Sequence, residues 1–175
     1  MFSFTDEWLA RRHTLEQLLT RMAELELGPG LEVIGYQTWR SYPALAPGEI
    51  RQFRRLVERL GLVPAALGAE VDLLRRVDRP MTTDEAGDFL LPQLTVAGEL
   101  GFLLVRVPPN VPAAVLEQVA PAAERAGVTV VVEIQGGEVP GDDAFPLALD
   151  FSVSMTSTTP GTALTSSIAF AAAGE

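Results

Sequence analysis

A carboxylate at the end of a very apolar segment is the residue of this chain best placed to do chemistry. Residues 128–135 read Val-Thr-Val-Val-Val-Glu-Ile-Gln and lie between Gly127 and Gly136. Such a run of β-branched residues is typical of a strand buried on both faces of a parallel sheet covered by helices. Active sites in these sheets lie at the carboxyl ends of the strands, so we expect Glu133 at the functional edge.

Glu133 has two interpretations, because an apolar environment penalises an unpaired carboxylate. It could have a functional role such as metal binding, or it could form a salt bridge with Arg106 from the neighbouring predicted strand. Arg106 is as suitable for a structural ion pair as for anchoring a substrate. The sequence leaves both alternatives open.

Other polar candidates fall in loops on the same expected face. Glu70 and Asp72 come just after the predicted strand 62–67, although a loop at this place is polar in most proteins. His13 is the single histidine and lies beside a predicted helix cap. A solvated histidine is the simpler expectation there, with a ligand role as the alternative.

Three aromatic residues follow the predicted strand 31–37 or lie at its end: Tyr36, Trp39 and Tyr42. Aromatic faces suit the C–H surfaces of sugars, so these residues could form the floor of a sugar pocket. They could equally pack the loop in which they lie. The sequence does not separate these two roles.

Capping and turn signals predict the elements that must position these residues. Thr14-Leu-Glu-Gln17 and Thr82-Thr-Asp-Glu85 fit capping boxes, and Pro47-Gly-Glu49 opens a third helix. Three helix-to-strand junctions share one pattern, in which a left-handed glycine ends the helix: Leu60-Gly61-Leu62, Leu100-Gly101-Phe102 and Ala126-Gly127-Val128. The expected strands are 2–5, 31–37, 62–67, 102–107, 128–135 and 147–152, with the last helices at 84–100 and 113–126.

Repeated strand–helix units of this kind build a parallel sheet, either doubly wound or closed into a barrel. A barrel is favoured, since no glycine-rich phosphate loop follows any predicted strand. A complete barrel takes around 250 residues, and this chain has 175. We therefore predict an α/β fold, a partial or truncated TIM-type barrel of about six mainly parallel strands with outer helices. It would occupy residues 1–152, followed by a Ser/Thr/Ala-rich tail at 153–175 without a strong period.

The amino-acid composition argues against several kinds of partner and site. A formal net charge of −10 argues against nucleic acid and against an anionic membrane surface as partners. The absence of cysteine excludes disulfides and thiolate metal sites. The N-terminal residues do not form a secretory signal, and no apolar segment is long enough to span a bilayer. We expect a cytoplasmic protein.

Several segments occur in an order that resembles a known family: Ser3-Phe-Thr-Asp-Glu-Trp8, Leu31-Glu-Val-Ile-Gly-Tyr-Gln37, Leu100-Gly-Phe102, Val105-Arg-Val107, Val132-Glu-Ile134 and Leu149-Asp-Phe-Ser152. Together they resemble the sugar phosphate isomerase/epimerase family of xylose isomerase-like TIM barrels. Within it, the Gly-Tyr-Gln and Asp-Phe-Ser segments are most similar to proteins related to C-glycoside deglycosidase catalytic subunits.

The resemblance implies a divalent metal ion, manganese or magnesium, held at the barrel mouth. The carboxylates of the family match Glu133 and Asp150, and hard oxygen ligands suit such ions. The metal would polarise a sugar carbonyl or hydroxyl while a nearby base moves the adjacent proton. We consider Arg106, Gln135, Glu70 and Trp39 as candidates for substrate binding. Gln135 stands where relatives often have histidine.

Two functions therefore remain. The first is a metal-dependent isomerase, epimerase or lyase acting on a sugar or sugar derivative. The second is non-catalytic: a truncated barrel that serves as an interaction subunit, or a degenerate remnant. The segment 136–146 is too short for the usual crossover helix, and the missing ligands favour the second function. The retained strand ends favour the first, which the family resemblance makes our leading expectation. Open sheet edges would bind another chain, so we predict a homo-oligomer or a companion subunit.

Overall fold

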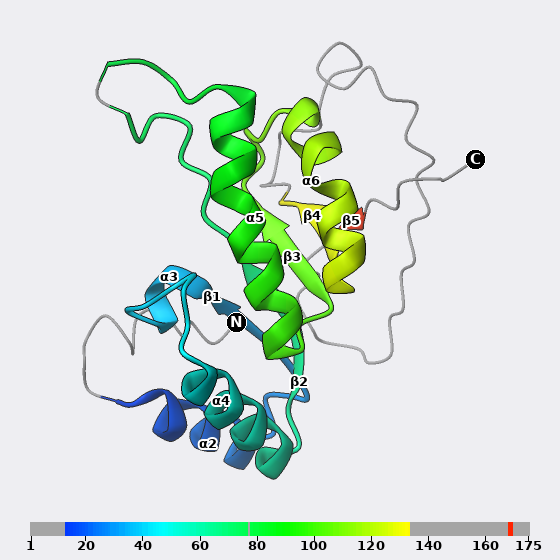
Figure 1. Cartoon of the computed structure of the whole chain (residues 1–175). Coiled ribbons are helices and arrows are strands. Elements are labelled where there is room, and N and C mark those ends of the chain that lie inside the picture. The colour runs from blue at the N-terminus through cyan, green and yellow to red at the C-terminus, as the bar shows by residue number, and fades with distance from the viewer. Residues whose placement is uncertain (1–12, 77, 134–167, 170–175) are drawn as a thin grey trace.

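The computed structural model of the chain describes residues 13–76, 78–133 and 168–169 (Figure 1). One sheet of strand order β1-β2-β3-β4-β5 forms its centre, and the pairs β1–β2, β2–β3 and β3–β4 are parallel. The strands are β1 Gly30–Ile34, β2 Val63–Gly68, β3 Leu104–Val107, β4 Thr129–Val132 and β5 Ile168–Ala169. The helices are α2 Leu15–Glu24, α3 Gly35–Thr38, α4 Pro47–Leu60, α5 Thr83–Leu100 and α6 Ala113–Ala126.

Four of the six predicted strands are thus present as a parallel sheet in chain order, which confirms the predicted α/β fold. The other two, at 2–5 and 147–152, lie outside the described residues. The tail contributes the short strand β5, which pairs antiparallel with β4. No period in the sequence had indicated a strand there.

The predicted capping boxes begin α2 and α5, and the predicted glycines end α4, α5 and α6. The Thr14 hydroxyl accepts the Gln17 N–H, while the Gln17 side chain accepts the Thr14 N–H at 2.8 Å. Gly61, Gly101 and Gly127 end α4, α5 and α6 with φ angles of 66°, 90° and 69°. These left-handed conformations suit glycine, which has no Cβ to clash with the following carbonyl.

The predicted strand 31–37 is wrong at its end, because β1 stops at Ile34 and the short helix α3 follows. The Thr38 hydroxyl donates to the carbonyl oxygen of Ile34 at 2.8 Å, which stabilises this turn. Gly35 lies directly against the ring of Tyr42, where an added Cβ would come within 2.3 Å of ring carbons. Tertiary packing at Gly35 therefore ends the strand earlier than the apolar pattern indicates.

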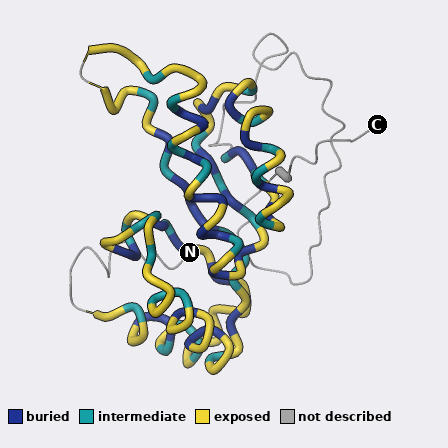
Figure 2. The backbone as a smooth tube through the Cα atoms, viewed as in Figure 1, coloured by how far each residue is buried: buried dark blue, intermediate teal, exposed yellow. Residues whose placement is uncertain are grey.

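The core lies between the sheet and the helices that cover one of its faces. In Figure 1, α5 and α6 lie in front of β3 and β4, and Figure 2 shows the buried strands behind the helices' exposed faces. Phe53 of α4 stacks on Phe102 at a centroid distance of 5.6 Å. Among the described residues, no helix is long and apolar enough to cross a membrane.

Candidate functional site

The two faces of the sheet have different chemistry, because side chains alternate along each strand. Leu31, Val33, Leu67, Val105 and Val107 belong to the apolar core with the helices. The opposite face, here called the inner face, carries the residues between them. In register across the four parallel strands these are Glu32, Ala66, Leu104 and Thr129, and then Ile34, Gly68, Arg106 and Val131.

Three charged residues form a row on the inner face, here called the charged row: Glu32, Arg106 and Glu133. Arg106 Nε donates to Glu32 Oε1 at 2.6 Å, and Arg106 Nη1 donates to Glu133 Oε2. The Arg106 side chain is 25% exposed, against 48% for Glu32 and 30% for Glu133. Solvent therefore screens the Glu32 pair more than the Glu133 pair.

Small residues on β2 allow Arg106 to reach across the sheet. Ala66 and Gly68 lie between β1 and β3 on the inner face. A Cβ added to Gly68 would lie 3.3 Å from both Arg106 Nη2 and Ile34 Cγ1. The guanidinium thus passes over a glycine to contact a carboxylate two strands away.

Glu133 has the predicted place at the carboxyl end of its strand, since its N–H continues the ladder by donating to the Val107 carbonyl at 2.9 Å. Its pairing with Arg106 is the salt bridge considered as the structural alternative. Glu32 was not among the sequence-predicted candidates. The available signal was its place between Leu31 and Val33, which directs its side chain away from the core. Asp150 and Gln135 lie outside the described residues.

A second polar cluster forms around Gln93 of α5, which is 1% exposed. Its Oε1 accepts from the Tyr42 hydroxyl and from the Glu70 N–H, both at 2.9 Å. Its Nε2 donates to the carbonyls of Glu70 at 2.8 Å and Phe89 at 3.0 Å. Burial, and secondarily the charge of Glu70, raises the pKa of Tyr42, which therefore stays protonated. Gln93 thus fixes the backbone of the candidate Glu70.

The Glu70 carboxylate lies 3.9 Å from Arg75 Nη1 at the start of the loop after β2. It is therefore on the edge expected from the sequence, where the strands end. Gln93 was missed as a site residue, although helical spacing places it on the buried face of α5, three residues after Leu90 and four before Ala97. His13, which precedes α2, is exposed.

The three aromatic candidates differ in how far their side chains are buried. Trp39 is 8% exposed and meets the ring of Phe53 edge-on at 5.3 Å, so it packs the core beneath its loop. Tyr42 belongs to the Gln93 cluster, and Tyr36 is 49% exposed. The role of Trp39 in substrate binding stays a prediction.

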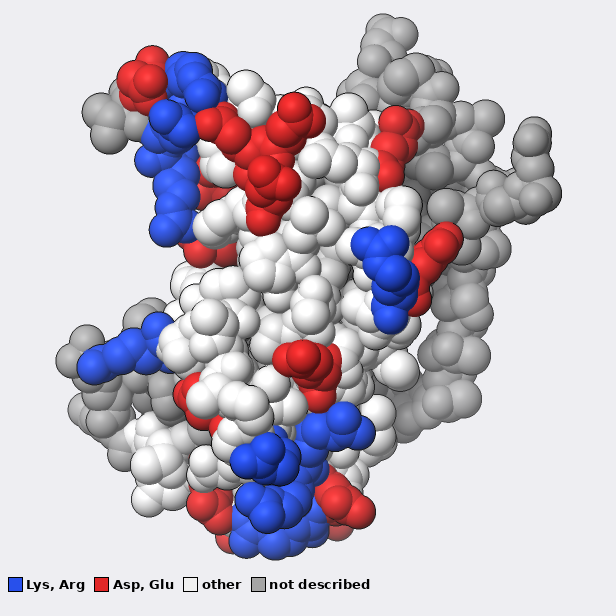
Figure 3. Space-filling view, in the orientation of Figure 1, with Lys and Arg blue, Asp and Glu red and all other residues white. Residues whose placement is uncertain are grey.

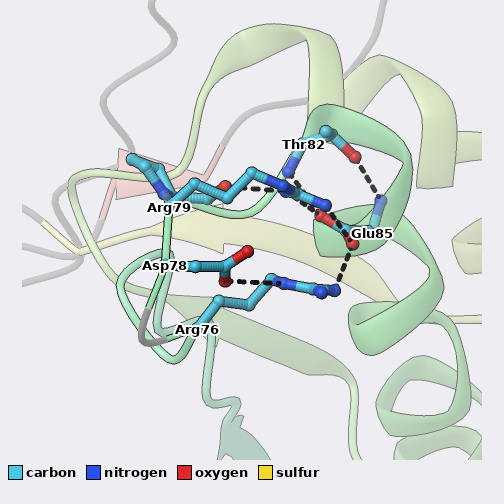
Figure 4. A network of polar contacts seen from close by, with 6 residues as sticks. Arg76, Asp78, Arg79, Thr82 and Glu85 are labelled. Carbon is cyan, nitrogen blue, oxygen red and sulfur yellow. Dashed lines mark hydrogen bonds and ion pairs between the residues drawn. The ribbon is translucent and has the colours of Figure 1, made fainter.

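A third cluster, here called the cap cluster, lies where the loop after β2 enters α5 (Figure 4). Glu85 accepts from Arg76 at 2.6 Å and from Arg79 at 2.7 and 2.9 Å, and Arg76 pairs with Asp78 at 3.5 Å. Glu85 also completes the capping box with Thr82. The Arg79 hydrogen bond is the first of the causes that lower the pKa of Glu85 to about 2.

The surface in Figure 3 mixes both signs of charge. Basic side chains lie beside acidic ones over α4 and over the loop before α5. A mixed surface of this kind gives no broad positive field to attract phosphates. The expectation that nucleic acid is not a partner stays a prediction.

The carboxylate of Glu133 is a hard oxygen ligand of the kind that divalent ions prefer, and in the described structure it is paired with the guanidinium of Arg106. Within the part of the chain that the structure describes, no three His, Cys, Asp or Glu side chains are grouped to hold a metal. A complete metal site would need ligands such as Asp150 from the remaining residues.

No protein-family model matches the sequence. The 3'-dehydrocarminate deglycosidase alpha subunit of a Microbacterium species is 39% identical over 134 residues, which cover 77% of this chain and 38% of that protein. A C-glycoside deglycosidase alpha subunit of Arthrobacter globiformis is 35% identical over 139 residues, which cover 79% and 38%. The chain therefore spans less than half the length of these curated relatives.

Solved structures share the fold. A D-psicose 3-epimerase determined with D-fructose has a TM-score of 0.56 at 13% identity, covering 72% of this chain and 48% of that one. The IolI protein with a bound zinc atom has a TM-score of 0.53 at 18% identity, covering 71% and 48%. This chain has the fold of part of a TIM barrel. The predicted resemblance, including that to C-glycoside deglycosidase subunits, is confirmed, and the described sheet is one part of such a barrel.

Proposed function

We propose that this xylose isomerase-like chain forms part of the sugar-binding barrel of a deglycosidase that acts on C-glycosides. The observation that carries the proposal is the charged row, which places two carboxylates and a guanidinium on the inner face of the sheet. In barrels of this type, ligands bind at the carboxyl ends of the strands, and Glu133 lies at such an end. The sequence relatives supply the substrate class through their names.

The row offers complementary hydrogen bonds to a sugar. The guanidinium of Arg106 carries five N–H donors, which suit a sugar carbonyl or hydroxyl oxygen. The carboxylates of Glu32 and Glu133 accept from sugar hydroxyls. Glu70, Gln135 and Trp39 remain proposed substrate-binding residues by their places in the sequence.

Glu133 and Asp150 would hold a manganese or magnesium ion, as the family resemblance implies. When bound, such an ion supplies a Lewis acid that polarises a carbonyl or hydroxyl oxygen of the sugar. In this proposal Arg106 orients the sugar, and the carboxylates of the charged row lie beside the sugar.

A companion chain is part of the proposal. The curated relatives are named alpha subunits, and this chain spans 38% of the length of each. We infer that the charged row becomes a closed site when further strands cover the inner face.

Turnover and metal content test the proposal together. The full chain, alone and with a companion subunit, is incubated with a C-glycoside oxidised at the sugar 3' position, and release of the aglycone is followed by mass spectrometry. Glu133→Gln should abolish release and should also remove bound manganese, measured by elemental analysis after dialysis. Glu99→Gln on the exposed surface of α5 is the matched control. Equal metal content in the Glu133→Gln variant and parent would count decisively against the metal site.

A non-catalytic interaction subunit is the second candidate. Among the described strands, β1 pairs with β2 alone, so one of its edges has no partner within them. Such an edge favours pairing with another chain. Sedimentation at micromolar concentration should then show a dimer or a complex without turnover. A compact monomer that releases aglycone would rule this candidate out.

A further inference from the structure

We propose that Gln93 is a positioning residue for sugar binding. Its buried amide holds the backbone of Glu70 so that the Glu70 carboxylate accepts a hydrogen bond from a sugar hydroxyl. The inference rests on the proposed function and deepens it. It gives helix α5, which covers the opposite face of the sheet, a part in recognising the sugar.

The backbone of Glu70 lies just beyond the last ladder bond of β2, in which the Ala69 N–H donates to a carbonyl of β3 at 2.8 Å. Successive peptide groups of an extended strand point to opposite sides, so the N–H and C=O of Glu70 point to the side of β1. Strand β1 ends at Ile34, before it reaches this level. The Gln93 amide takes the place of that strand, because it accepts from the Glu70 N–H at 2.9 Å and donates to the Glu70 carbonyl at 2.8 Å.

The same extended backbone directs the Glu70 side chain to the inner face. Gly68 and Val131 lie in one inner-face row. Glu70 and Glu133 each follow that row by two residues, so the alternation of side chains returns both to the inner face at the same level. The intervening Ala69 is buried in the core on the other face. Glu70 therefore lies at the same edge as the charged row.

The Glu70 carboxylate keeps its capacity to accept hydrogen bonds. Among the described residues it accepts none, and its ion-pair partner Arg75 Nη1 lies 3.9 Å away. Arg75 has its own support, since its guanidinium lies 4.8 Å from the centre of the Phe89 ring. The Glu70 side chain is 35% exposed, so a ligand can reach it. A hydroxyl group of a sugar supplies the donor that such a carboxylate accepts.

A purely structural role is the alternative for Gln93. Its amide also bonds the Tyr42 hydroxyl and the Phe89 carbonyl, and a buried amide with four partners stabilises the chain in any case. Loss of a structural residue would disturb sugar binding whether or not Glu70 carries a carboxylate. A positioning residue acts through that carboxylate alone. The effect of Gln93 in a chain without the Glu70 side chain therefore separates the two roles.

Hydrogen exchange of the Glu70 amide, followed by NMR on the full chain, tests whether Gln93 holds the backbone. Gln93→Asn keeps an amide but is one methylene shorter, so it does not reach both groups of Glu70. Exchange at Glu70 should become about tenfold faster, as expected for the loss of one hydrogen bond. Tyr42→Phe is the matched control, because it removes another donor to Gln93 and leaves both bonds to Glu70. It should leave the exchange rate of Glu70 unchanged.

Calorimetric titration of the full chain with 3'-dehydrocarminate, the compound in the name of one relative, tests the sugar contact. Glu70→Ala should weaken binding about tenfold, the loss expected for a hydrogen bond to a charged group. Gln93→Asn should weaken binding about fivefold in the parent chain and should have no effect in the Glu70→Ala chain. Glu99→Gln removes a charge from the exposed surface of α5 and is the control.

The outcomes separate this inference from the proposed function. Unchanged exchange at Glu70 in Gln93→Asn would mean that Gln93 does not hold this backbone. Equal losses of affinity in both backgrounds would make Gln93 a structural residue, and parental affinity in Glu70→Ala would exclude Glu70 from the sugar contact. Each of these results overturns the inference and leaves the proposed function standing. A parent chain that does not bind 3'-dehydrocarminate would overturn both. Circular dichroism identifies any loss of fold, and Gln93→Met, which fills a similar volume, repeats the comparison if Gln93→Asn does not fold.

Discussion

The molecule contains two clusters of arginine and carboxylate that differ in how they are built. The cap cluster joins residues within the segment 76–85, and its members also begin helix α5. The charged row joins residues separated by 74 and 27 positions along the chain. The first exists wherever its own loop and helix turn form, whereas the second requires three strands in correct register.

Their surroundings differ as well. Arg76 and Arg79 of the cap cluster are 47% and 43% exposed, against 25% for Arg106, so solvent screens the cap-cluster arginines more. The charged row lies on strands at a partly covered face, where removing one partner leaves another charge without compensation. The same residue types therefore stabilise a local turn in one region. In the other region they contact one another only when the strands of the sheet have paired.

The largest effect should come from Arg106→Met, which leaves two carboxylates on the inner face without their shared cation. We expect the free energy of unfolding to fall by about 2 kcal/mol, between the values typical of exposed and buried pairs. Urea denaturation in the presence of a chelator measures it. Arg106→Lys, which keeps the charge, should lose less. An effect no larger than that of Thr82→Ala would contradict the contrast between the clusters.

Gly68→Val should have the next largest effect, because its side chain would occupy the path of Arg106 over β2. Overpacking of this kind costs about 1.5 kcal/mol. Gly68→Ala, whose Cβ meets its neighbours at 3.3 Å, is the smaller control. In the Arg106→Met background, Gly68→Val should cost less. Equal costs in the two backgrounds would show that the arginine does not depend on this space.

Thr82→Ala tests the local nature of the cap cluster. Losing the N-cap hydroxyl should lower the free energy of unfolding by about 1 kcal/mol. The effect should add to that of Arg106→Met, since the two sites share no partner. Denaturation of the double variant measures the sum. A clear departure from additivity would mean that the clusters are coupled.

The smallest effect is the pH dependence carried by Glu85. Its pKa is lowered from 4.5 to about 2 in the folded chain, mainly by the hydrogen bond from Arg79. Its contribution to stability is complete above the unfolded value and is lost as the pH falls from 4.5 to about 2. Thermal melting over this window should show a shallower pH dependence for Glu85→Gln. An unchanged slope would show that the ion pairs of Glu85 do not contribute to the pH dependence of stability.

Local signals in the sequence determined much of the fold. The capping boxes at Thr14 and Thr82 and the glycines at 61, 101 and 127 lie where the helices begin and end. These features involve hydrogen bonds between residues three to five positions apart, so a short stretch of sequence contains all the partners. The sequence also placed Glu133 at a strand end and named Arg106 as its alternative partner.

The tertiary structure decided the rest. Glu32 joins the charged row only because β1 pairs with β2 in a register that shifts after Leu31 and because Gly68 leaves room for Arg106. The burial of Trp39 and of Gln93 depends on helices α4 and α5 reaching the ends of β1 and β2. Such contacts join residues far apart in the chain, and their geometry follows from the packing of whole elements. No local pattern of residue types encodes it.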